Sequence, residues 1–374
     1  MMPRTPDIDA VITILTRLVG FRTITDGPNL DMIDWVQGFL DDAGFAVTHI
    51  PSPCGTKAGL LAKYGTGDGG VLYAAHSDVV PVAGQNWSDD PFKLRQDGDR
   101  LIGRGATDMK GFLACVLAHA QQLNTSPPDR PFMIALSWDE EIGCRGIPHM
   151  IDHVIPTLGR PDLVIVGEPT DMHLCIGHKG KAAYKAICTG EAGHSALAPQ
   201  FKNALHDAAK VITALQDVQA EVASQGPRDD AYEIAYSTLH AGKMTGGVAL
   251  NIVPQHAEID FEIRFLAADD PDQILAQIAA KAPRGVRLEK QNAYPGFSAD
   301  PSREHCKHVA QFLEVKTPMK VTFGTEAGFF AALGLDTVVC GPGSMTEDGH
   351  QPDEGVAMEQ LGKCAQFIQG LSNE

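Results

Sequence analysis

The sequence contains no pair of cysteines at CxxC spacing, and its eight cysteines are scattered along 374 residues. Several lie within apolar or helical runs, a pattern that predicts reduced thiols in a cytoplasmic protein rather than a disulfide framework. No run of about 18 apolar residues occurs, so we expect no membrane-spanning helix. Near the start of the chain, apolar residues at helical spacing alternate with polar ones, which predicts an amphipathic surface helix rather than a signal peptide. These apolar positions are Ile8, Val11, Ile12, Leu15 and Val19.

Basic side chains are scarce. The 30 lysine and arginine residues against 47 acidic residues leave a net charge of −17 at pH 7. A charge of this sign argues against nucleic acid or an anionic membrane as a partner. We expect most of the acidic residues to lie on a solvated surface, with a weaker electrostatic preference for cationic substrates. The length exceeds what one hydrophobic core usually fills, so two domains are expected.

Two patterns of helices and strands meet near residue 178. Before it, helices and strands alternate, which predicts an α/β domain with a helix-covered mixed sheet. After it, residues 181–290 follow the order strand, helix, strand, strand, helix, strand, with the second strand at 233–241; this order predicts a ferredoxin-like α+β domain. A strand near 335–340 then returns the chain to the first domain. We therefore predict one discontinuous domain, 1–178 and 291–374, interrupted by an inserted domain, 179–290.

Five times, a run typical of a buried strand or a sharp glycine turn stops at a residue type that binds metals. Three of these runs, Val71–Ala75, Phe132–Trp138 and Leu163–Gly167, are almost continuously apolar, as in strands covered on both faces. In open α/β sheets, ligands bind in the crevice beyond the carboxyl ends of the strands. Imidazole and carboxylate together suit zinc or a similar divalent ion, so a binuclear metal site is the leading hypothesis. The residues at these ends are His76, Asp108, Glu140 with Glu141, Glu168 and His350.

Each position also has an ordinary structural interpretation. A histidine such as His76 or His350 is commonly a surface residue near a turn. Asp108 follows glycines where a helix is expected to begin, and it can simply cap that helix. Glu140 and Glu141 can form a solvated acidic turn, and Glu168 can belong to a turn that ends a strand. The shared placement of all five positions at strand ends and turns favours a metal site over independent coincidences.

Three of the motifs have a spacing that suits hydrolysis at two metal ions. His76 and Asp78 share one face of an extended segment, so the carboxylate can orient the imidazole and raise its basicity. A carboxylate at Asp108 can bridge two cations about 3.5 to 4 Å apart. The adjacent Glu140 and Glu141 point in different directions, which allows one to bind metal while the other acts as a general base.

The motifs resemble, in order and context, a family of zinc hydrolases that includes aminoacylase, carboxypeptidase G, succinyl-diaminopimelate desuccinylase and acetylornithine deacetylase. The resemblance covers almost the whole chain. The segments that carry it are His76–Asp78, Gly105–Gly111, Glu140–Glu141, Glu168–Thr170 and His350.

This resemblance implies a role for each metal-ligand type. Asp108 bridges two zinc ions, for which cobalt or manganese can substitute. His76 and Glu168 complete one site, and Glu141 and His350 complete the other. The resemblance also implies that a water between the metals attacks an amide carbonyl.

Two further residues have implied roles in catalysis. Glu140 is the general base and acid, which takes the proton of the attacking water and returns it to the leaving amine. Asp78 supports His76.

The inserted domain resembles the lid and dimerisation domain of the same family. This resemblance rests on Gly193–Ser195, Gly246–Pro254 and Glu262–Phe265. It implies a homodimer in which His194 and Asn251 reach the active site of the partner subunit to hold the oxyanion. Arg264 is implied to bind a substrate carboxylate. A turn histidine, a strand asparagine and a surface arginine are the alternative interpretations.

The substrate is indicated by residues 323–328 and 340–344, which look most like the acetylornithine deacetylase branch. That branch implies hydrolysis of N2-acetyl-L-ornithine to L-ornithine and acetate. Thr325 and Glu326 are the candidate substrate contacts, because an acidic Glu326 can face the cationic amine and repel a diacid. Glu326 can equally be a solvated loop residue, and the acidic loop before His350 differs from that of many deacetylases. Another N-acyl amino acid deacylase, the desuccinylase, a dipeptidase, and a metal-free binding protein on the same fold remain alternatives.

Overall fold

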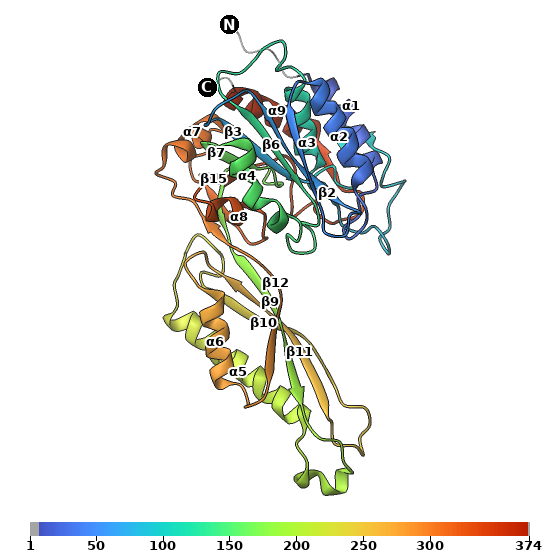
Figure 1. The fold of residues 1–374 in the computed structure, drawn as a ribbon, viewed down its shortest axis with the longest axis vertical. Coiled ribbons are helices and arrows are strands. Elements are labelled where there is room, and N and C mark those ends of the chain that lie inside the picture. Colours follow the sequence, from blue (N-terminus) through green and yellow to red (C-terminus); the bar gives the residue numbers. More distant parts are fainter. Residues whose placement is uncertain (1–6, 373–374) are drawn as a thin grey trace. The chain divides into compact units, whose positions relative to one another are not determined.

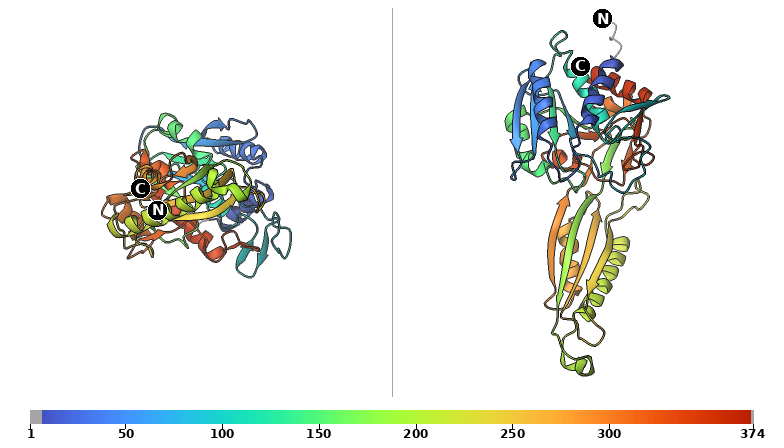
Figure 2. Two further views of the ribbon diagram at one scale, coloured as in Figure 1. Left: turned by 90° about the horizontal axis from the view of Figure 1, so that it is seen from below. Right: turned by 90° about the vertical axis from the view of Figure 1, so that its right-hand side faces the viewer.

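The computed structural model describes residues 7–372, which form two compact units (Figure 1, Figure 2). The first unit contains the described residues up to Gly177, together with Ala299–Met319 and the residues from Thr325 onward. The inserted unit contains His178–Ser298 and Lys320–Gly324. Within residues 7–372, every helix is too short or too polar to cross a lipid bilayer.

A mixed sheet forms the centre of the first unit. Its strands follow one another as β1 (Ala46–Pro51), β2 (Ala58–Tyr64), β6 (Phe132–Ser137), β3 (Val71–His76), β7 (Leu163–Val166), β15 (Thr337–Val339), β8 (Cys175–His178) and β13 (Phe297–Ser298), and β14 (Met319–Val321) also pairs with β8. Strands β6, β3, β7 and β15 run parallel, whereas β1, β2 and β8 pair antiparallel with their neighbours. The side chains of β3, β6 and β7 are almost all buried, which explains why these strands are apolar throughout.

Helices cover both faces of this sheet (Figure 1). They are α1 (Ile8–Gly20), α2 (Leu30–Asp42), α3 (Lys110–Ala120), α4 (Ile151–Leu158), α7 (Glu304–Phe312), α8 (Ala327–Ala332) and α9 (Met358–Ser372). Helix α3 is buried almost all round because it lies between α1, α9 and β3. Helix α1 is amphipathic as predicted, and buries Val11, Leu15 and Val19 in the same core.

A small sheet holds two distant loops side by side. Its strands are β16 (Gly355–Ala357), β5 (Arg100–Ile102) and β4 (Arg95–Asp97). Because β16 pairs antiparallel with β5, the residues before Gly355 lie beside those after Ile102. The loop that contains His350 is therefore fixed next to the loop that contains Asp108. This sheet was not predicted from the sequence, because each of its strands is only 3 residues long.

The inserted unit has the predicted ferredoxin-like order. Its elements are β9 (Gly180–Thr189), α5 (Ala204–Gln225), β10 (Thr238–Gly246), β11 (His256–Phe265), α6 (Pro271–Lys281) and β12 (Arg287–Tyr294). The strands form an antiparallel sheet in the order β10-β11-β9-β12. Burial alternates along β11, because α5 and α6 pack on one face of the sheet. The predicted fold class, a helix-covered mixed sheet with an inserted ferredoxin-like domain, is confirmed.

One strand of the inserted unit begins later than predicted. The expected strand at 233–241 is observed as Thr238–Gly246. Two backbone carbonyl groups before Thr238 accept hydrogen bonds from a lysine instead of from a neighbouring strand. Lys179 Nζ donates to Ile234 O at 2.7 Å and to Tyr236 O at 2.6 Å. These residues form a loop around the lysine and do not join the sheet.

Candidate metal centre

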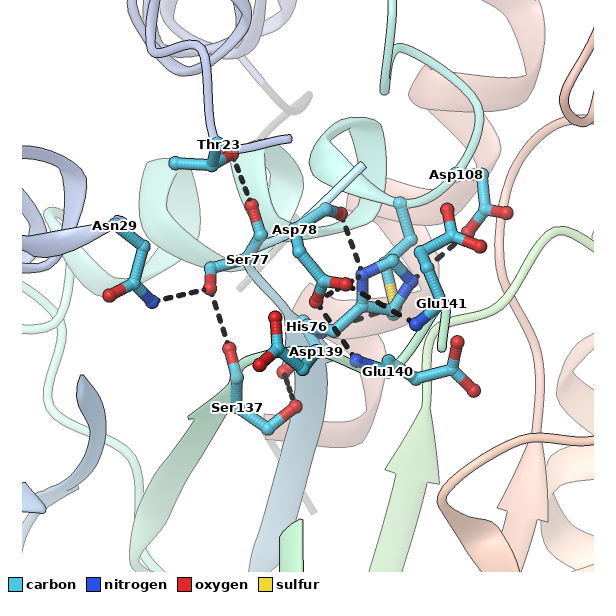
Figure 3. A network of polar contacts seen from close by, with 12 residues as sticks. Thr23, Asn29, His76, Ser77, Asp78, Asp108, Ser137, Asp139, Glu140 and Glu141 are labelled. Carbon is cyan, nitrogen blue, oxygen red and sulfur yellow. Dashed lines mark hydrogen bonds and ion pairs between the residues drawn. The ribbon is translucent and has the colours of Figure 1, made fainter. Parts of the chain in front are cut away.

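The carboxyl ends of the parallel strands converge on one group of polar side chains (Figure 3). Strand β3 ends at His76, β6 leads into the turn that begins at Asp139, and Glu168 follows β7 closely. Asp108 lies just before α3, in a loop whose Gly105 has a φ of +81°. A Cβ at Gly105 would lie 2.7 Å from Val79 Cγ1, so this loop requires glycine.

The first group of candidate ligands is His76, Asp108 and Glu168. Their ligand atoms lie within 4.8 Å of one another, and all three residues are buried. His76 Nε2 is 3.1 Å from Asp108 Oδ1 and 3.9 Å from Glu168 Oε1. We call this set the first triad. The burial of His76 rules out the alternative of a surface histidine at this position.

The second group is Asp108, Glu141 and His350, whose ligand atoms also lie within 4.8 Å of one another. His350 Nε2 is 2.9 Å from Glu141 Oε2 and 3.4 Å from Asp108 Oδ2. We call this set the second triad. Asp108 belongs to both triads and directs a different oxygen to each, which is the arrangement that a bridging carboxylate requires.

Burial and mutual repulsion raise the pKa values of the glutamate carboxyl groups in this centre. Burial and the neighbouring Asp108 carboxylate together raise the pKa of Glu141 to about 7. Burial and the same neighbour also raise the pKa of Glu168 well above its usual value. In addition, Glu141 Oε1 is buried and accepts no hydrogen bond from residues 7–372. A buried acidic cluster with an unpartnered oxygen fits divalent cations.

The pKa values of the two histidines are also raised, which favours their charged forms. Hydrogen bonds to Asp108 and Glu141 raise the pKa of His350 to about 10. Burial lowers the pKa of His76, but hydrogen bonds to Asp108 and Asp78 outweigh burial and raise it well above the usual value. Burial raises the pKa of Asp108, yet its hydrogen bonds to both histidines hold it well below the usual range. Both histidines are therefore directed by charge toward the shared carboxylate.

Glu140 lies beside the triads and belongs to neither. Figure 3 shows the side chains of Glu140 and Glu141 leaving the turn in different directions. Glu140 Oε1 accepts a hydrogen bond from Cys144 Sγ at 3.3 Å. Burial raises the pKa of Glu140 well above its usual value, and the carboxylates of Glu141 and Glu326 raise it further. A raised pKa favours the protonated form of a carboxyl group, which a general acid requires.

Asp78 connects His76 to the acidic turn. Its carbonyl oxygen lies 2.9 Å from His76 Nδ1, while its carboxylate lies 3.6 Å from the same nitrogen. The two carboxylate oxygens accept hydrogen bonds from the backbone N–H groups of Glu140, at 3.1 Å, and Glu141, at 3.3 Å (Figure 3). A proton on Nδ1 leaves Nε2 free to bind a metal. Asp78 thus holds both the imidazole ring and the two glutamates.

A buried lysine that the sequence analysis missed supports the same turn. Asp139 has a φ of +52°, and its carboxylate accepts hydrogen bonds from Lys57 Nζ at 2.5 Å and from the backbone N–H of Asp26 at 3.0 Å. Lys57 precedes β2, and its partner lies 82 residues further along the chain. A lysine in a polar loop gives no periodic signal, so nothing in the sequence marked it.

The two predicted substrate contacts in the first unit lie at the start of α8. Thr325 is buried, and its Oγ1 accepts a hydrogen bond from the backbone N–H of Ala327 at 3.0 Å. Glu326 is only 2% exposed, so the alternative of a solvated loop residue is wrong. Burial raises the pKa of Glu326 to about 7, against the lowering effect of a hydrogen bond with Ser137.

The other predicted residues lie in the inserted unit. His194 Nδ1 accepts a hydrogen bond from the backbone N–H of Ala196 at 3.1 Å, and Asn251 O accepts one from Ser195 N at 3.1 Å. His194 and Asn251 are therefore on paired segments. Arg264 donates hydrogen bonds to Glu262 Oε1 and to the hydroxyl of Tyr294, both at 2.9 Å.

Comparison with known proteins shows which family the chain belongs to. The chain is similar to an acetylornithine deacetylase of Pasteurella multocida (strain Pm70), with 32% identity over 364 residues, 92% of this chain and 91% of the relative. Its fold is similar to that of an M20 family metallo-carboxypeptidase from Sulfolobus solfataricus, with a TM-score of 0.79, 19% identity and coverage of 97% and 98% of the two chains.

A second solved structure with this fold is a dinuclear metal-binding M20 peptidase of Bacillus subtilis. It has a TM-score of 0.63 and 15% identity, and the match covers 96% of this chain and 98% of that one. Residues 72–374 match the family described as peptidase family M20/M25/M40. That match includes both triads and Glu140, and the chain belongs to peptidase family M20/M25/M40.

Proposed function

We propose that this protein removes the acetyl group from N2-acetyl-L-ornithine to give L-ornithine and acetate, a step of arginine biosynthesis. The observation that carries the chemistry is the pair of triads that share Asp108, with Glu140 beside them and in neither. The similarity to an acetylornithine deacetylase along nine-tenths of the chain supports the substrate.

The proposed metal ligands are His76, Asp108 and Glu168 for one ion, and Asp108, Glu141 and His350 for the other. This set of imidazole and carboxylate groups suits two zinc ions per chain, and cobalt or manganese can substitute. When bound, two such cations lower the pKa of a water molecule to about 7 and polarise an amide carbonyl.

The protein's own groups then move the proton. In this proposal Glu140 takes a proton from the attacking water and delivers it to the nitrogen of the leaving amine. The position of Glu140 beside the triads and in neither supports this role, and its raised pKa favours uptake of the proton. Asp78 acts as a positioning residue, since its carboxylate holds the backbone of Glu140 and its carbonyl oxygen holds the ring of His76.

The residues of the inserted unit and of α8 are proposed to select and hold the substrate. His194 and Asn251 stabilise the oxyanion in the partner subunit's site, and Arg264 binds the substrate carboxylate. Thr325 and Glu326 contact the side chain that carries the cationic amine. In support, Glu326 Oε1 is buried and accepts no hydrogen bond from the described part of the chain.

We also propose that the protein is a cytoplasmic homodimer joined through the inserted unit. In support, Leu250 is fully exposed and Val248 is 86% exposed, in the same segment as Asn251. Apolar side chains exposed in this way commonly mark an interface. All eight cysteines are free, which suits a reducing compartment. Light scattering of the purified protein tests the dimer, and a monomeric mass at micromolar concentration would contradict it.

The substrate is tested by a side-by-side assay. Purified protein loaded with zinc, cobalt or manganese is given acetylornithine, succinyl-diaminopimelate and dipeptides, and released amine is measured. We expect the highest kcat/KM for acetylornithine. A preference for succinyl-diaminopimelate would overturn the substrate assignment. Fewer than about one zinc per chain, together with no hydrolysis at saturating metal, would instead favour a binding protein.

A further inference from the structure

A buried ion pair lies behind the metal centre. Arg104 and Glu354 each expose 1% of their side chains, and Arg104 Nη1 lies 2.6 Å from Glu354 Oε2. Neither residue belongs to a triad, and the sequence analysis singled out neither. Burying two charges costs desolvation energy that their attraction only partly repays, so stability alone does not explain the pair.

Glu354 holds the loop that presents Asp108. Its Oε1 accepts hydrogen bonds from the backbone N–H groups of Thr107, at 2.9 Å, and Asp108, at 3.0 Å. Its Oε2 accepts a third from Gly105 N at 3.1 Å. One carboxylate therefore satisfies three backbone donors of this loop, and it fixes the backbone from which the shared ligand extends.

Arg104 connects the same carboxylate to the loop that presents His350. Arg104 Nη1 donates to Gln351 O at 3.3 Å, and Nη2 donates to Gln85 Oε1. Gln85 Nε2 in turn donates to His350 O at 2.7 Å. The guanidinium group also lies 4.9 Å from the centre of the Trp87 ring. A continuous set of contacts thus runs from the backbone of Asp108 to the backbone of His350.

We propose that Gln85, Arg104 and Glu354 form a clamp that sets the spacing between Asp108 and His350 and so controls metal binding at the second triad. The inference rests on the two-metal arrangement proposed above. It gives the clamp residues a positioning role, because they touch the backbone of the ligands and no reacting atom.

The clamp acts unequally on the two triads. His76 is held by β3, and Glu168 by the end of β7, so the first triad depends on the clamp through Asp108 alone. The second triad depends on it through both Asp108 and His350. Contacts that orient metal ligands typically contribute 10- to 100-fold in affinity. Loss of the clamp is therefore expected to weaken the second binding event more than the first.

Calorimetric titration of the metal-free full chain with Zn²⁺ tests this expectation, and it needs no substrate. We expect two binding events in the wild type. Gln85→Leu removes the contacts of the Gln85 amide with His350, Arg104 and Trp87 but leaves the Arg104–Glu354 pair and the hydrogen bonds of Glu354 to the Asp108 loop. It should weaken the second event about 10-fold and the first less than about twofold. Glu354→Gln should weaken the second about 100-fold and the first at most about 10-fold.

Asp353→Asn is the matched control, because Asp353 anchors the same loop through Ser88 and Arg95 without touching the Asp108 loop. We expect both of its affinities to stay within about twofold of wild type. Equal weakening of both events by Gln85→Leu, or an effect of Asp353→Asn as large as that of Glu354→Gln, would reduce the clamp to general loop support and overturn the proposal.

The possible outcomes distinguish a failure of the clamp proposal from a failure of the proposed function. If Glu354→Gln does not fold, Gln85→Leu still decides, because it leaves the ion pair intact. Two events in the wild type that are unchanged in Gln85→Leu overturn the clamp alone. A single event in the wild type overturns the two-metal arrangement itself. Two events without hydrolysis of acetylornithine overturn the proposed substrate and leave the clamp in place.

Discussion

Replacing Glu140 by glutamine separates proton transfer from metal binding. The change keeps the size of the side chain and leaves an oxygen that can accept the hydrogen bond from Cys144 Sγ, which lies 3.3 Å from Glu140 Oε1. It removes the group that can take up a proton. Because Glu140 belongs to neither triad, we expect the metal content of Glu140→Gln to match that of the wild type.

The size of the expected loss in kcat follows from the role of Glu140 as general acid and base. General acid and base catalysis by one positioned side chain is typically worth about 10²- to 10⁴-fold in rate. We therefore expect kcat for acetylornithine to fall by that factor, about 3 to 5 kcal/mol of transition-state stabilisation, with KM changed by less than about threefold. Steady-state kinetics and metal analysis by mass spectrometry are measured on the same samples.

Glu141→Gln is the matched control, since it makes the same chemical change one residue later. Glu141 Oε2 lies 2.9 Å from His350 Nε2, so this variant is expected to lose metal as well as activity. A Glu140→Gln protein that loses metal together with activity would make Glu140 a ligand. A Glu140→Gln protein with unchanged kcat would show that another group moves the proton.

Two further predictions concern buried charge and pH. Lys57→Met leaves Asp139 buried without its cation, so we expect a loss of about 3 kcal/mol in unfolding free energy and a lower kcat. Arg130→Met, which breaks the exposed pair with Asp162, should cost less than about 1 kcal/mol in the same urea titration, and equal losses would contradict the argument. Burial lowers the pKa of His119 from 6.5 to about 4. Below pH 6.5 the imidazole of His119 takes up a proton in the unfolded chain but not in the folded chain. The contribution of the buried neutral imidazole to the unfolding free energy is therefore complete above pH 6.5 and is lost as the pH falls toward 4. His119→Gln should remove about 3 kcal/mol of that pH dependence, and an unchanged slope between wild type and variant would refute it.

The parts of the fold that could be predicted from the sequence are those marked by a local pattern of residues. The apolar runs before His76 and Glu168 identify buried strands, and parallel strands bring their carboxyl ends to one edge. The alternation of strands and helices likewise predicts the ferredoxin-like unit. The displaced start of β10 was missed because it depends on Lys179, a residue more than 50 positions away.

The parts that could not be predicted from the sequence depend on pairs of charged residues far apart in the chain. Lys57 with Asp139, and Arg104 with Glu354, each lie in polar loops where neither periodicity nor composition distinguishes a buried charge from a solvated one. Their partners are 82 and 250 residues away, respectively. For Glu326 the sequence left a substrate contact and a solvated loop residue open, and only the structure shows that the side chain is buried.

The position of the inserted unit between the ligands affects how the centre assembles. His76, Asp108 and Glu168 all precede it, whereas His350 follows it. During synthesis on a ribosome, the complete set for one ion emerges before the inserted unit, and the set for the other is finished only after that unit has emerged. The elements that support the first triad, β15, α9 and the Glu354 side chain, also follow the inserted unit. We therefore expect a nascent chain to gain metal binding, and with it hydrolysis, only after the inserted unit has emerged.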